Sequence, residues 1–362
     1  MSDTRSDRPA VLAEFLDPQV NMERREDGSL ILSSPVPLEP YEQSFGAILR
    51  NSSTAVPDRV FLAERDGEES WRKLTYGEMQ ARCDSVAQAL LDKGLNQDRP
   101  LMILSGNSID HATLTLAAMQ VGIPVAPVSV AYSLMSQDHA KLAHVRDLVE
   151  PALVYAADAR FDAALAVACA HGAETVIGEG GIAPLLATDP TDAVESAFAA
   201  VGPDSVAKYL FTSGSTGMPK GVINTHGMLC ANQQMSTQMR PGGPRKPPVL
   251  LDWLPWNHTY GGNAIFHGII RNRGTLYIDA GRPQPGMFET TLRNLQDVSP
   301  TNYYSVPVGY AMLVPAMERD PELCRKFFAE LEFATYAGAV LPEDLWHRLQ
   351  GLARRTTGRR VL

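Results

Sequence analysis

Short apolar runs alternate with helical segments along most of the chain beyond residue 40. The runs predict a first set of strands at 101–104, 123–128, 153–156 and 174–177. They predict a second set at 208–211, 249–254, 275–278, 302–306 and 333–337. Apolar residues at helical spacing predict helices over 109–120 and 161–170. This alternation is typical of α/β proteins, so we expect two mostly parallel sheets flanked by helices.

One predicted helix carries recognisable signals at both ends. Thr75 can cap its start, Glu78 stands three residues later as a capping-box partner, and Gly94 can end it. Apolar residues recur between these ends at positions 79, 83, 86, 90 and 91, which predicts one buried face.

The pattern also suggests how the chain is divided. Residues 1–40 carry prolines and charges with little periodicity, which predicts an extended N-terminal arm. We expect a first α/β subdomain at 41–200 and a second, incomplete one at 201–362. The Gly-, Ala-, Pro- and Asp-rich segment 178–203 is interpreted as a linker between them. Segment 240–248 is expected to be a surface loop whose three basic residues are simply solvated, although they also suit a phosphate.

Composition narrows the classes of function. The 362 residues are 44% hydrophobic and carry a formal net charge of -9 without an extended basic stripe, which argues against nucleic-acid binding. Four scattered cysteines without a CxxC pair predict reduced thiols. The start is polar, and Pro124 and Pro127 interrupt the most apolar stretch, so we expect neither a secretory signal nor a membrane span. A cytoplasmic location is the resulting expectation.

The strongest chemical signal is a glycine-rich segment directly after a predicted strand. Its ten residues include three glycines, four hydroxyl side chains and one lysine: Thr212, Ser213, Gly214, Ser215, Thr216, Gly217, Met218, Pro219, Lys220 and Gly221. Glycines let backbone N–H groups converge on an anion, and hydroxyls and a lysine add further donors. This combination predicts a site for a polyphosphate.

Three other interpretations of this segment fit less well. A flexible linker would not stand between two apolar runs. A Walker A loop requires GKS or GKT, whereas Met218 and Pro219 separate Gly217 from Lys220 and Gly221 follows. The GxSxG elbow of hydrolases is absent from the segment, which argues against Ser213 or Ser215 as a nucleophile.

FTSGSTGMPKG resembles the signature loop of the acyl-adenylate-forming superfamily, which includes acyl-CoA synthetases, luciferases and peptide-synthetase adenylation domains. A second segment, LPWNHTYGGN at 254–263, together with PLMILSGNS and PVAPVSVAYSL, most resembles the feruloyl-CoA synthetases. Aromatic and small residues alternate in this second segment, as in a flat slot for an aromatic acid, although a packed turn explains the same pattern.

The resemblance implies roles for individual residues. It assigns the acyl pocket to Trp256, His258, Tyr260, Gly262 and Val306, with His258 as the residue that turns during catalysis. It assigns Thr212–Gly217 and Lys220 to the phosphates of ATP. YAGAVLP resembles the element that lies against adenine, which points to Gly338 and Ala339, although Ala337 and Val340 depart from the usual pattern.

The resemblance further implies a two-step reaction that uses ATP, Mg²⁺ and coenzyme A. An aromatic carboxylic acid, ferulate or another hydroxycinnamate, would become an acyl-adenylate and then a CoA thioester. The superfamily's AMP-binding motif and C-terminal mobile domain are not found, so we expect weak or no turnover and a possible homo-oligomer. The alternatives are a ligase for another aromatic or medium-chain acid, and a non-catalytic fragment that binds nucleotide or acid.

Overall fold

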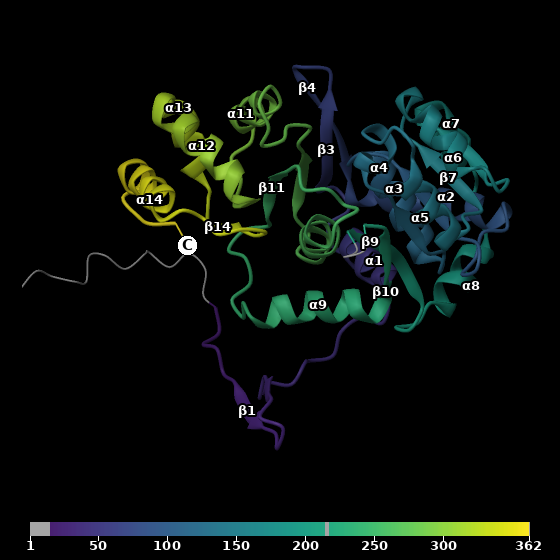
Figure 1. Ribbon diagram of the computed structural model, residues 1–362, viewed down its shortest axis with the longest axis horizontal. Coiled ribbons are helices and arrows are strands. Elements are labelled where there is room, and N and C mark those ends of the chain that lie inside the picture. Colours follow the sequence, from purple (N-terminus) through teal and green to yellow (C-terminus); the bar gives the residue numbers. More distant parts are fainter. Residues whose placement is uncertain (1–14, 214–216, 362) are drawn as a thin grey trace, which may run out of the picture.

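The computed structural model describes residues 15–213 and 217–361 (Figure 1). Its largest sheet has six strands in the order β10-β9-β6-β5-β7-β8, and all neighbouring pairs are parallel except the antiparallel pair β9–β10. The strands are β5 (Leu101–Leu104), β6 (Val125–Pro127), β7 (Leu153–Ala156), β8 (Glu174–Ile177), β9 (Val206–Ser213) and β10 (Pro219–Thr225).

The second sheet has four strands in the order β11-β12-β3-β4, in which β3 and β4 are antiparallel. They are β3 (Val60–Asp66), β4 (Ser70–Thr75), β11 (Val249–Asp252) and β12 (Thr275–Ile278). A parallel pair, β13 (Asn302–Ser305) and β14 (Phe333–Tyr336), lies beside β11. Both large sheets take strands from each side of residue 200, so the subdomain boundary expected there does not coincide with a boundary between sheets.

Helices cover these sheets, which confirms the α/β architecture. They are α1 (Phe45–Ala55), α2 (Tyr76–Asp92), α3 (Ile109–Gln120), α4 (Val130–Leu134), α5 (Ala140–Val149), α6 (Asp162–Ala168), α7 (Gly178–Leu186), α8 (Asp192–Ala200), α9 (His226–Gln238), α10 (Phe266–Arg271), α11 (Phe288–Asp297), α12 (Pro307–Arg319), α13 (Pro321–Ala329) and α14 (Glu343–Thr357). Two shorter segments are η2 (Ala159–Phe161) and the π-helical η3 (Tyr260–Ile265).

The predicted capping box of α2 is present. The Thr75 hydroxyl accepts a hydrogen bond from Glu78 N at 3.2 Å, and the Glu78 carboxylate accepts one from Thr75 N at 2.7 Å. Four residues of the predicted apolar face, Met79, Cys83, Val86 and Leu90, are fully buried in the largest core cluster, and Leu91 is partly buried against it. Two of the backbone N–H groups that have no partner within the helix, those of Thr75 and Glu78, are therefore satisfied locally, as the sequence indicated.

The linker expected at 178–203 is wrong, because most of this segment is helical. Both α7 and α8 pack against α2. Thr191 caps α8 by accepting from Ala193 N at 3.2 Å, and Thr191 N donates to Gln88 Oε1 at 2.9 Å. Buried Ile182, Leu185 and Val194 provide the packing that the Gly- and Ala-rich composition concealed.

The N-terminal arm is extended over its described part and includes an unpredicted hairpin. Strands β1 (Asn21–Arg24) and β2 (Leu30–Ser33) pair antiparallel and project from the body of the molecule (Figure 1). The arm is tied to the end of α9, since Leu16 N donates to Met239 O at 3.0 Å and Glu39 N donates to Gln238 Oε1 at 2.9 Å.

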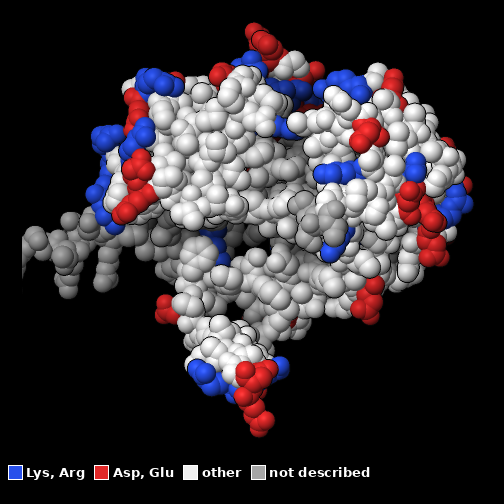
Figure 2. All heavy atoms as spheres, viewed as in Figure 1, with Lys and Arg blue, Asp and Glu red and all other residues white. Residues whose placement is uncertain are grey.

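The surface charge agrees with the composition. Figure 2 shows acidic and basic side chains interspersed on the visible face, mostly around its margins, without a basic stripe. Among the residues that the structure describes, no helix is both long and apolar enough to span a bilayer. Cys83, Cys169, Cys230 and Cys324 are free thiols, as expected.

Candidate active site

The described residues of the glycine-rich segment lie at the end of β9 and the start of β10, which pair as an antiparallel hairpin. Ser213 pairs with Pro219 and Thr212 pairs with Lys220, so two antiparallel strands hold the two ends of the loop together. The side chains of Thr212 and Lys220 are exposed, and Gly217 has a φ of +86°, which favours glycine. Gly214, Ser215 and Thr216 lie outside the described residues. Because β10 follows the loop, the strand-to-helix turn of a Walker A site is excluded here.

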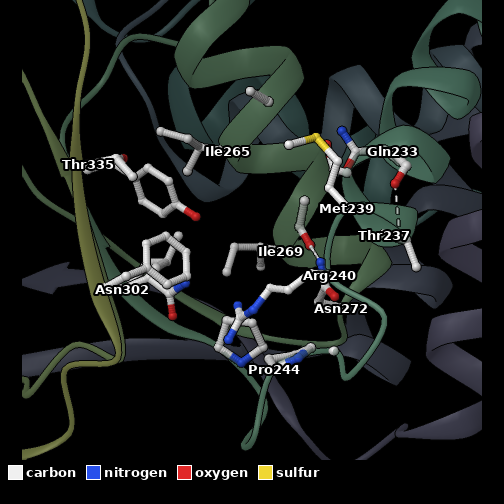
Figure 3. Close-up of a pocket in the computed structure, with 18 of the residues that line it drawn as sticks. Gln233, Thr237, Met239, Arg240, Pro244, Ile265, Ile269, Asn272, Asn302 and Thr335 are labelled. Atoms are coloured by element: carbon white, nitrogen blue, oxygen red, sulfur yellow. Dashed lines mark hydrogen bonds between the residues drawn. The ribbon is translucent and has the colours of Figure 1, made fainter. Parts of the chain in front are cut away.

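A cavity of about 330 Å³ lies between α9, the η3–α10 segment and the β13–β14 pair (Figure 3). Its walls are mostly apolar, and four aromatic residues, Phe15, Tyr260, Tyr304 and Phe333, contribute to them. Figure 3 shows Thr335 and Ile265 on one side of the cavity and Arg240, Pro244 and Asn272 on the opposite side. A cavity of this volume with aromatic walls suits a small planar molecule.

The two parallel strands give the cavity a direction. Asn302 and Tyr304 of β13 and Phe333 and Thr335 of β14 line it, at the alternating positions of one strand face. Tyr304 and Thr335 lie nearer the carboxyl ends of the strands, where open α/β sheets commonly bind ligands. Asn302 and Phe333 lie at the opposite end.

Tyr260 connects the start of η3 to this strand pair. Its hydroxyl lies 3.3 Å from Thr335 Oγ1, and its ring centroid is 6.4 Å from that of Tyr304 in an edge-on arrangement. Burial raises the pKa of Tyr260, and the hydrogen bond with Thr335 opposes this shift in part. Tyr260 is therefore a neutral wall residue at physiological pH, held at the strand ends.

The residues expected to contact adenine and the acyl group adjoin this end of the cavity. Gly338 has a φ of +88°, and a Cβ placed on it would lie 3.9 Å from Val306 Cγ1. Gly338 and Ala339 are exposed directly after β14, and Ala337 N donates to Ser305 O at 3.3 Å. Val306, Gly338 and Ala339 thus come together at the carboxyl ends of β13 and β14.

Other expected acyl-pocket residues lie outside the cavity lining. Trp256 is 4% exposed and packs in the core, with its ring centroid 4.3 Å from that of Phe266 and 5.3 Å from that of His111. His258 is exposed, and its Nδ1 accepts a hydrogen bond from Tyr260 N at 3.2 Å. Contacts of Trp256 and His258 with a substrate stay predictions.

Gly262 has a packing role that the sequence did not reveal. A Cβ on Gly262 would lie 2.2 Å from Trp256 O, and one on Gly261 would lie 2.6 Å from both Leu254 O and Pro255 O. The glycine pair therefore lets η3 approach the preceding loop closely, which brings Tyr260 to the cavity.

Several cavity residues were not singled out from the sequence. Arg240 belongs to the segment interpreted as a solvated loop, yet its guanidinium forms a 2.6 Å ion pair with buried Glu332. Four further lining residues lie in short strands: Asn302, Tyr304, Phe333 and Thr335. The available sequence signal for them was the alternation of side chains between the two faces of a strand. They come together with Arg240 through tertiary packing.

A buried basic cluster includes a lysine of β9, the first strand of the β9–β10 hairpin. Lys208 of β9 is 2% exposed, and its Nζ lies 3.2 Å from His267 Nε2. Burial lowers the pKa of Lys208 to about 7. Burial also lowers the pKa of His226 to about 4, and that of His267 well below its usual value, with the charge of Lys208 adding to both shifts. These histidines are neutral near pH 7.

Comparison with known proteins agrees with this fold. Residues 49–359 match the family described as AMP-binding enzyme. The chain is 26% identical over 291 residues to 4-chlorobenzoate–CoA ligase of Arthrobacter sp., an alignment that covers 78% of this chain and 51% of that ligase. It is 28% identical over 316 residues to benzoate–CoA ligase of Thauera aromatica, covering 83% of this chain and 56% of that ligase. The chain thus spans about half the length of these curated relatives.

Solved structures show the same fold at lower identity. Apo MatB from Rhodopseudomonas palustris superimposes with a TM-score of 0.65 and 22% identity, covering 88% of this chain and 58% of MatB. VinN in complex with L-aspartate gives a TM-score of 0.69 and 18% identity, covering 86% of this chain and 73% of VinN. The family match extends over most of the chain and includes the hairpin and the cavity, and the chain therefore belongs to the AMP-binding enzyme family.

Proposed function

We propose that this chain provides the acid- and ATP-binding part of an ATP-dependent acid–thiol ligase for an aromatic carboxylic acid. The observation that carries this proposal is the cavity of about 330 Å³ with Tyr260, Tyr304 and Phe333 in its walls. Tyr304 and Thr335 line it near the carboxyl ends of β13 and β14, after which Val306 and Gly338 meet. The names of the relatives that act on benzoate and 4-chlorobenzoate support an aromatic acid.

The reaction has two steps. A carboxylate oxygen of the acid attacks the α-phosphorus of ATP, and the bond from that phosphorus to the bridging oxygen breaks, which releases pyrophosphate. A thiolate then attacks the acyl carbon, and the bond to the AMP oxygen breaks. Holding two anions together is the main physical difficulty, so positioning and preorganised donors supply much of the rate acceleration.

The hairpin and the strand ends suit the two parts of ATP. Lys220 and the hydroxyls of the 212–217 loop would hold the β- and γ-phosphates, because a lysine and backbone N–H groups stabilise anionic oxygens. Exposed backbone at Gly338 and Ala339 would lie against adenine. His258, two residues before Tyr260, would contact the reacting carboxylate, and Val306 would flank it.

Mg²⁺ and coenzyme A belong to the same proposal. Within residues 15–213 and 217–361 there is no group of three or more His, Cys, Asp or Glu side chains suited to a metal ion. Mg²⁺ in nucleotide sites is commonly held by one or two carboxylates together with substrate phosphates. We therefore expect it to enter with ATP, where it would neutralise phosphate charge, and coenzyme A to supply the thiol.

Within aromatic acids, we propose a hydroxycinnamate such as ferulate. The support is the sequence motif LPWNHTYGGN, together with a cavity that extends along β13 and β14 rather than ending at Thr335. Other aromatic or medium-chain acids are the competing substrates. One methylene in an apolar pocket changes discrimination by only about 1–3 kcal/mol, so direct competition is needed to rank them.

Acid-dependent exchange of labelled pyrophosphate into ATP tests the proposal, measured on a longer form of the protein that contains this chain, because weak or no turnover is expected of the chain alone. Ferulate should support more exchange than benzoate or hexanoate, and His258→Ala should reduce the rate about tenfold or more. His347→Ala is the matched control, because His347 is exposed on α14 and pairs with Glu343 at 3.5 Å, so its rate should equal that of the wild type. Equal exchange with and without acid would contradict the ligase proposal.

The alternative in a different class is a non-catalytic binding module. It predicts saturable binding of acid or ATP without pyrophosphate exchange. Exchange by a longer form of the protein that contains this chain would exclude that alternative.

A further inference from the structure

Arg240 is a partly buried cation at the end of the cavity that lies away from the strand carboxyl ends. It follows α9 and lines the cavity together with Asn302 and Phe333. Its guanidinium carbon lies 5.1 Å from the Phe333 ring centroid, within the range of a cation–π contact. An arginine whose side chain is only 12% exposed is costly in a mostly apolar wall, so its presence calls for an explanation.

The hydrogen bonding of Arg240 is incomplete. A guanidinium has five N–H donors. Among the described residues, one hydrogen bond from this guanidinium is present: Nη2 donates to Glu332 Oε2 at 2.6 Å. Its Nε is buried without a hydrogen-bond partner in the same part of the chain. Because Nε is closed off by the protein, a ligand oxygen in the cavity would have to meet one of the other N–H groups of the guanidinium.

Charge restricts that ligand atom further. Glu332 is 6% exposed and already neutralises the guanidinium. A second carboxylate on the ligand would lie close to the Glu332 carboxylate and be repelled. A neutral oxygen, such as a phenol or a methoxy group, accepts a hydrogen bond without this repulsion.

The position of Arg240 matches the far end of an extended acid. Residues 302 and 306 stand four positions apart along the strand direction, about 13 Å at about 3.3 Å per residue. A carboxylate near Val306 would therefore stand far enough from Arg240 and Asn302, which Figure 3 shows in the cavity wall, for a ring and a further substituent to lie between them. The shorter benzoates would not reach this end.

We infer that Arg240, held by Glu332, is a specificity-determining residue that donates a hydrogen bond to a neutral oxygen on the distal ring position of the bound acid. This inference rests on the proposed function, because it requires the acid to occupy the cavity. It selects phenolic or methoxylated acids over unsubstituted acids and over diacids.

Calorimetric titration of this chain with cinnamate, 4-hydroxycinnamate and 4-carboxycinnamate tests the inference. The wild type should bind 4-hydroxycinnamate about 10- to 100-fold more tightly than cinnamate, the range expected for a hydrogen bond to a charged group. In Arg240→Met/Glu332→Gln, which leaves no unpaired buried charge, this preference should vanish while cinnamate still binds. Arg245→Met, on the exposed part of the same loop, is the control and should keep the wild-type preference.

A second variant, Glu332→Gln, retains the guanidinium and separates this inference from a general loss of structure. It should gain affinity for 4-carboxycinnamate, because the cation is no longer neutralised. An unchanged preference for the hydroxyl in the double variant, or no gain for the diacid in Glu332→Gln, would overturn the role of Arg240. Failure of the wild type to bind any of the three acids would instead overturn the proposed function, and this inference with it.

Discussion

The hydroxyl of Tyr260 lies 3.3 Å from Thr335 Oγ1, although 75 positions separate the two residues along the chain. This contact joins the start of η3 to β14 in the wall of the aromatic cavity. The position of the Tyr260 ring therefore depends on the packing of two segments that the sequence shows only as separate motifs.

Two substitutions of Tyr260 separate its ring from its hydroxyl. Tyr260→Phe should lower the free energy of unfolding by about 1 kcal/mol, because Thr335 loses a partner, and should leave aromatic-acid affinity within about twofold. Tyr260→Ala should weaken acid binding at least tenfold by removing a wall of the cavity. Denaturant titration and calorimetry measure the two effects, and equal acid affinity in both variants would contradict the role of the ring.

Gly262→Ala tests the close approach of η3 to the preceding loop. The new Cβ would lie 2.2 Å from Trp256 O, so the backbone must shift, and we expect a loss of about 1–3 kcal/mol of stability. The matched control is Gly242→Ala, because its Cβ would meet nothing within 4 Å and its φ is not positive. Denaturation curves of the two variants should differ clearly. Equal curves would show that the loop adjusts without cost.

Lys208 should make stability depend on pH in the alkaline range. Burial lowers its pKa from 10.5 to about 7, so between these pH values the unfolded chain binds a proton that the folded chain has released. The free energy of unfolding therefore gains up to about 1.4 kcal/mol per pH unit from this residue as pH rises. The neighbouring His226 and His267 have pKa values below this window in the folded chain and an ordinary value of 6.5, so the slope that they add falls away just above pH 7.

Lys208→Met removes this titration. The stability of the variant relative to the wild type should be highest near pH 7 and decline as pH rises toward about 10, as measured by urea unfolding at several pH values. Lys73→Met, at an exposed position of β4, should keep the wild-type slope. A difference between Lys208→Met and wild type that stays constant over this range would show that Lys208 remains charged in the folded protein.

Local signals predicted much of the fold. The capping box of α2, the bounds of α3 and the strands at 101–104, 153–156, 174–177 and 275–278 agree with the structure, because short buried strands and capped helices depend on neighbouring residues. The strand predicted at 249–254 is longer than the one observed, since β11 ends at Asp252 before the turn that leads to Trp256. Helices α7 and α8 were missed because their buried faces are small.

The candidate site was less accessible to sequence reasoning. The glycine-rich loop is contiguous and carries its own chemistry, so the motif was visible. The cavity combines Arg240, Tyr260, Asn302 and Thr335 from segments far apart in sequence, and no single segment carries a signal for it. Trp256 was predicted to contact the acid because its motif is aromatic; its ring packs in the core beside Phe266, and the contact with the acid stays a prediction.

Lys220 provides a test of the phosphate hairpin. Lys220→Met should weaken MgATP binding about tenfold or more, because a charge-assisted hydrogen bond to phosphate contributes roughly 1.5–3 kcal/mol. Affinity for the aromatic acid alone should not change. Lys73→Met serves again as the exposed control, and isothermal titration measures all three proteins. Normal MgATP affinity in Lys220→Met would remove this lysine from the phosphate site.

The most direct test of the central claim is to fill the cavity and measure acid binding. Ala264 lines the cavity, and Ala264→Phe places a ring within it, whereas Ala199→Phe adds the same ring to an exposed position of α8. Calorimetric titration with ferulate should show saturable binding to the wild type and to Ala199→Phe, and none to folded Ala264→Phe. Undiminished binding by Ala264→Phe would contradict the assignment of this cavity to the aromatic acid.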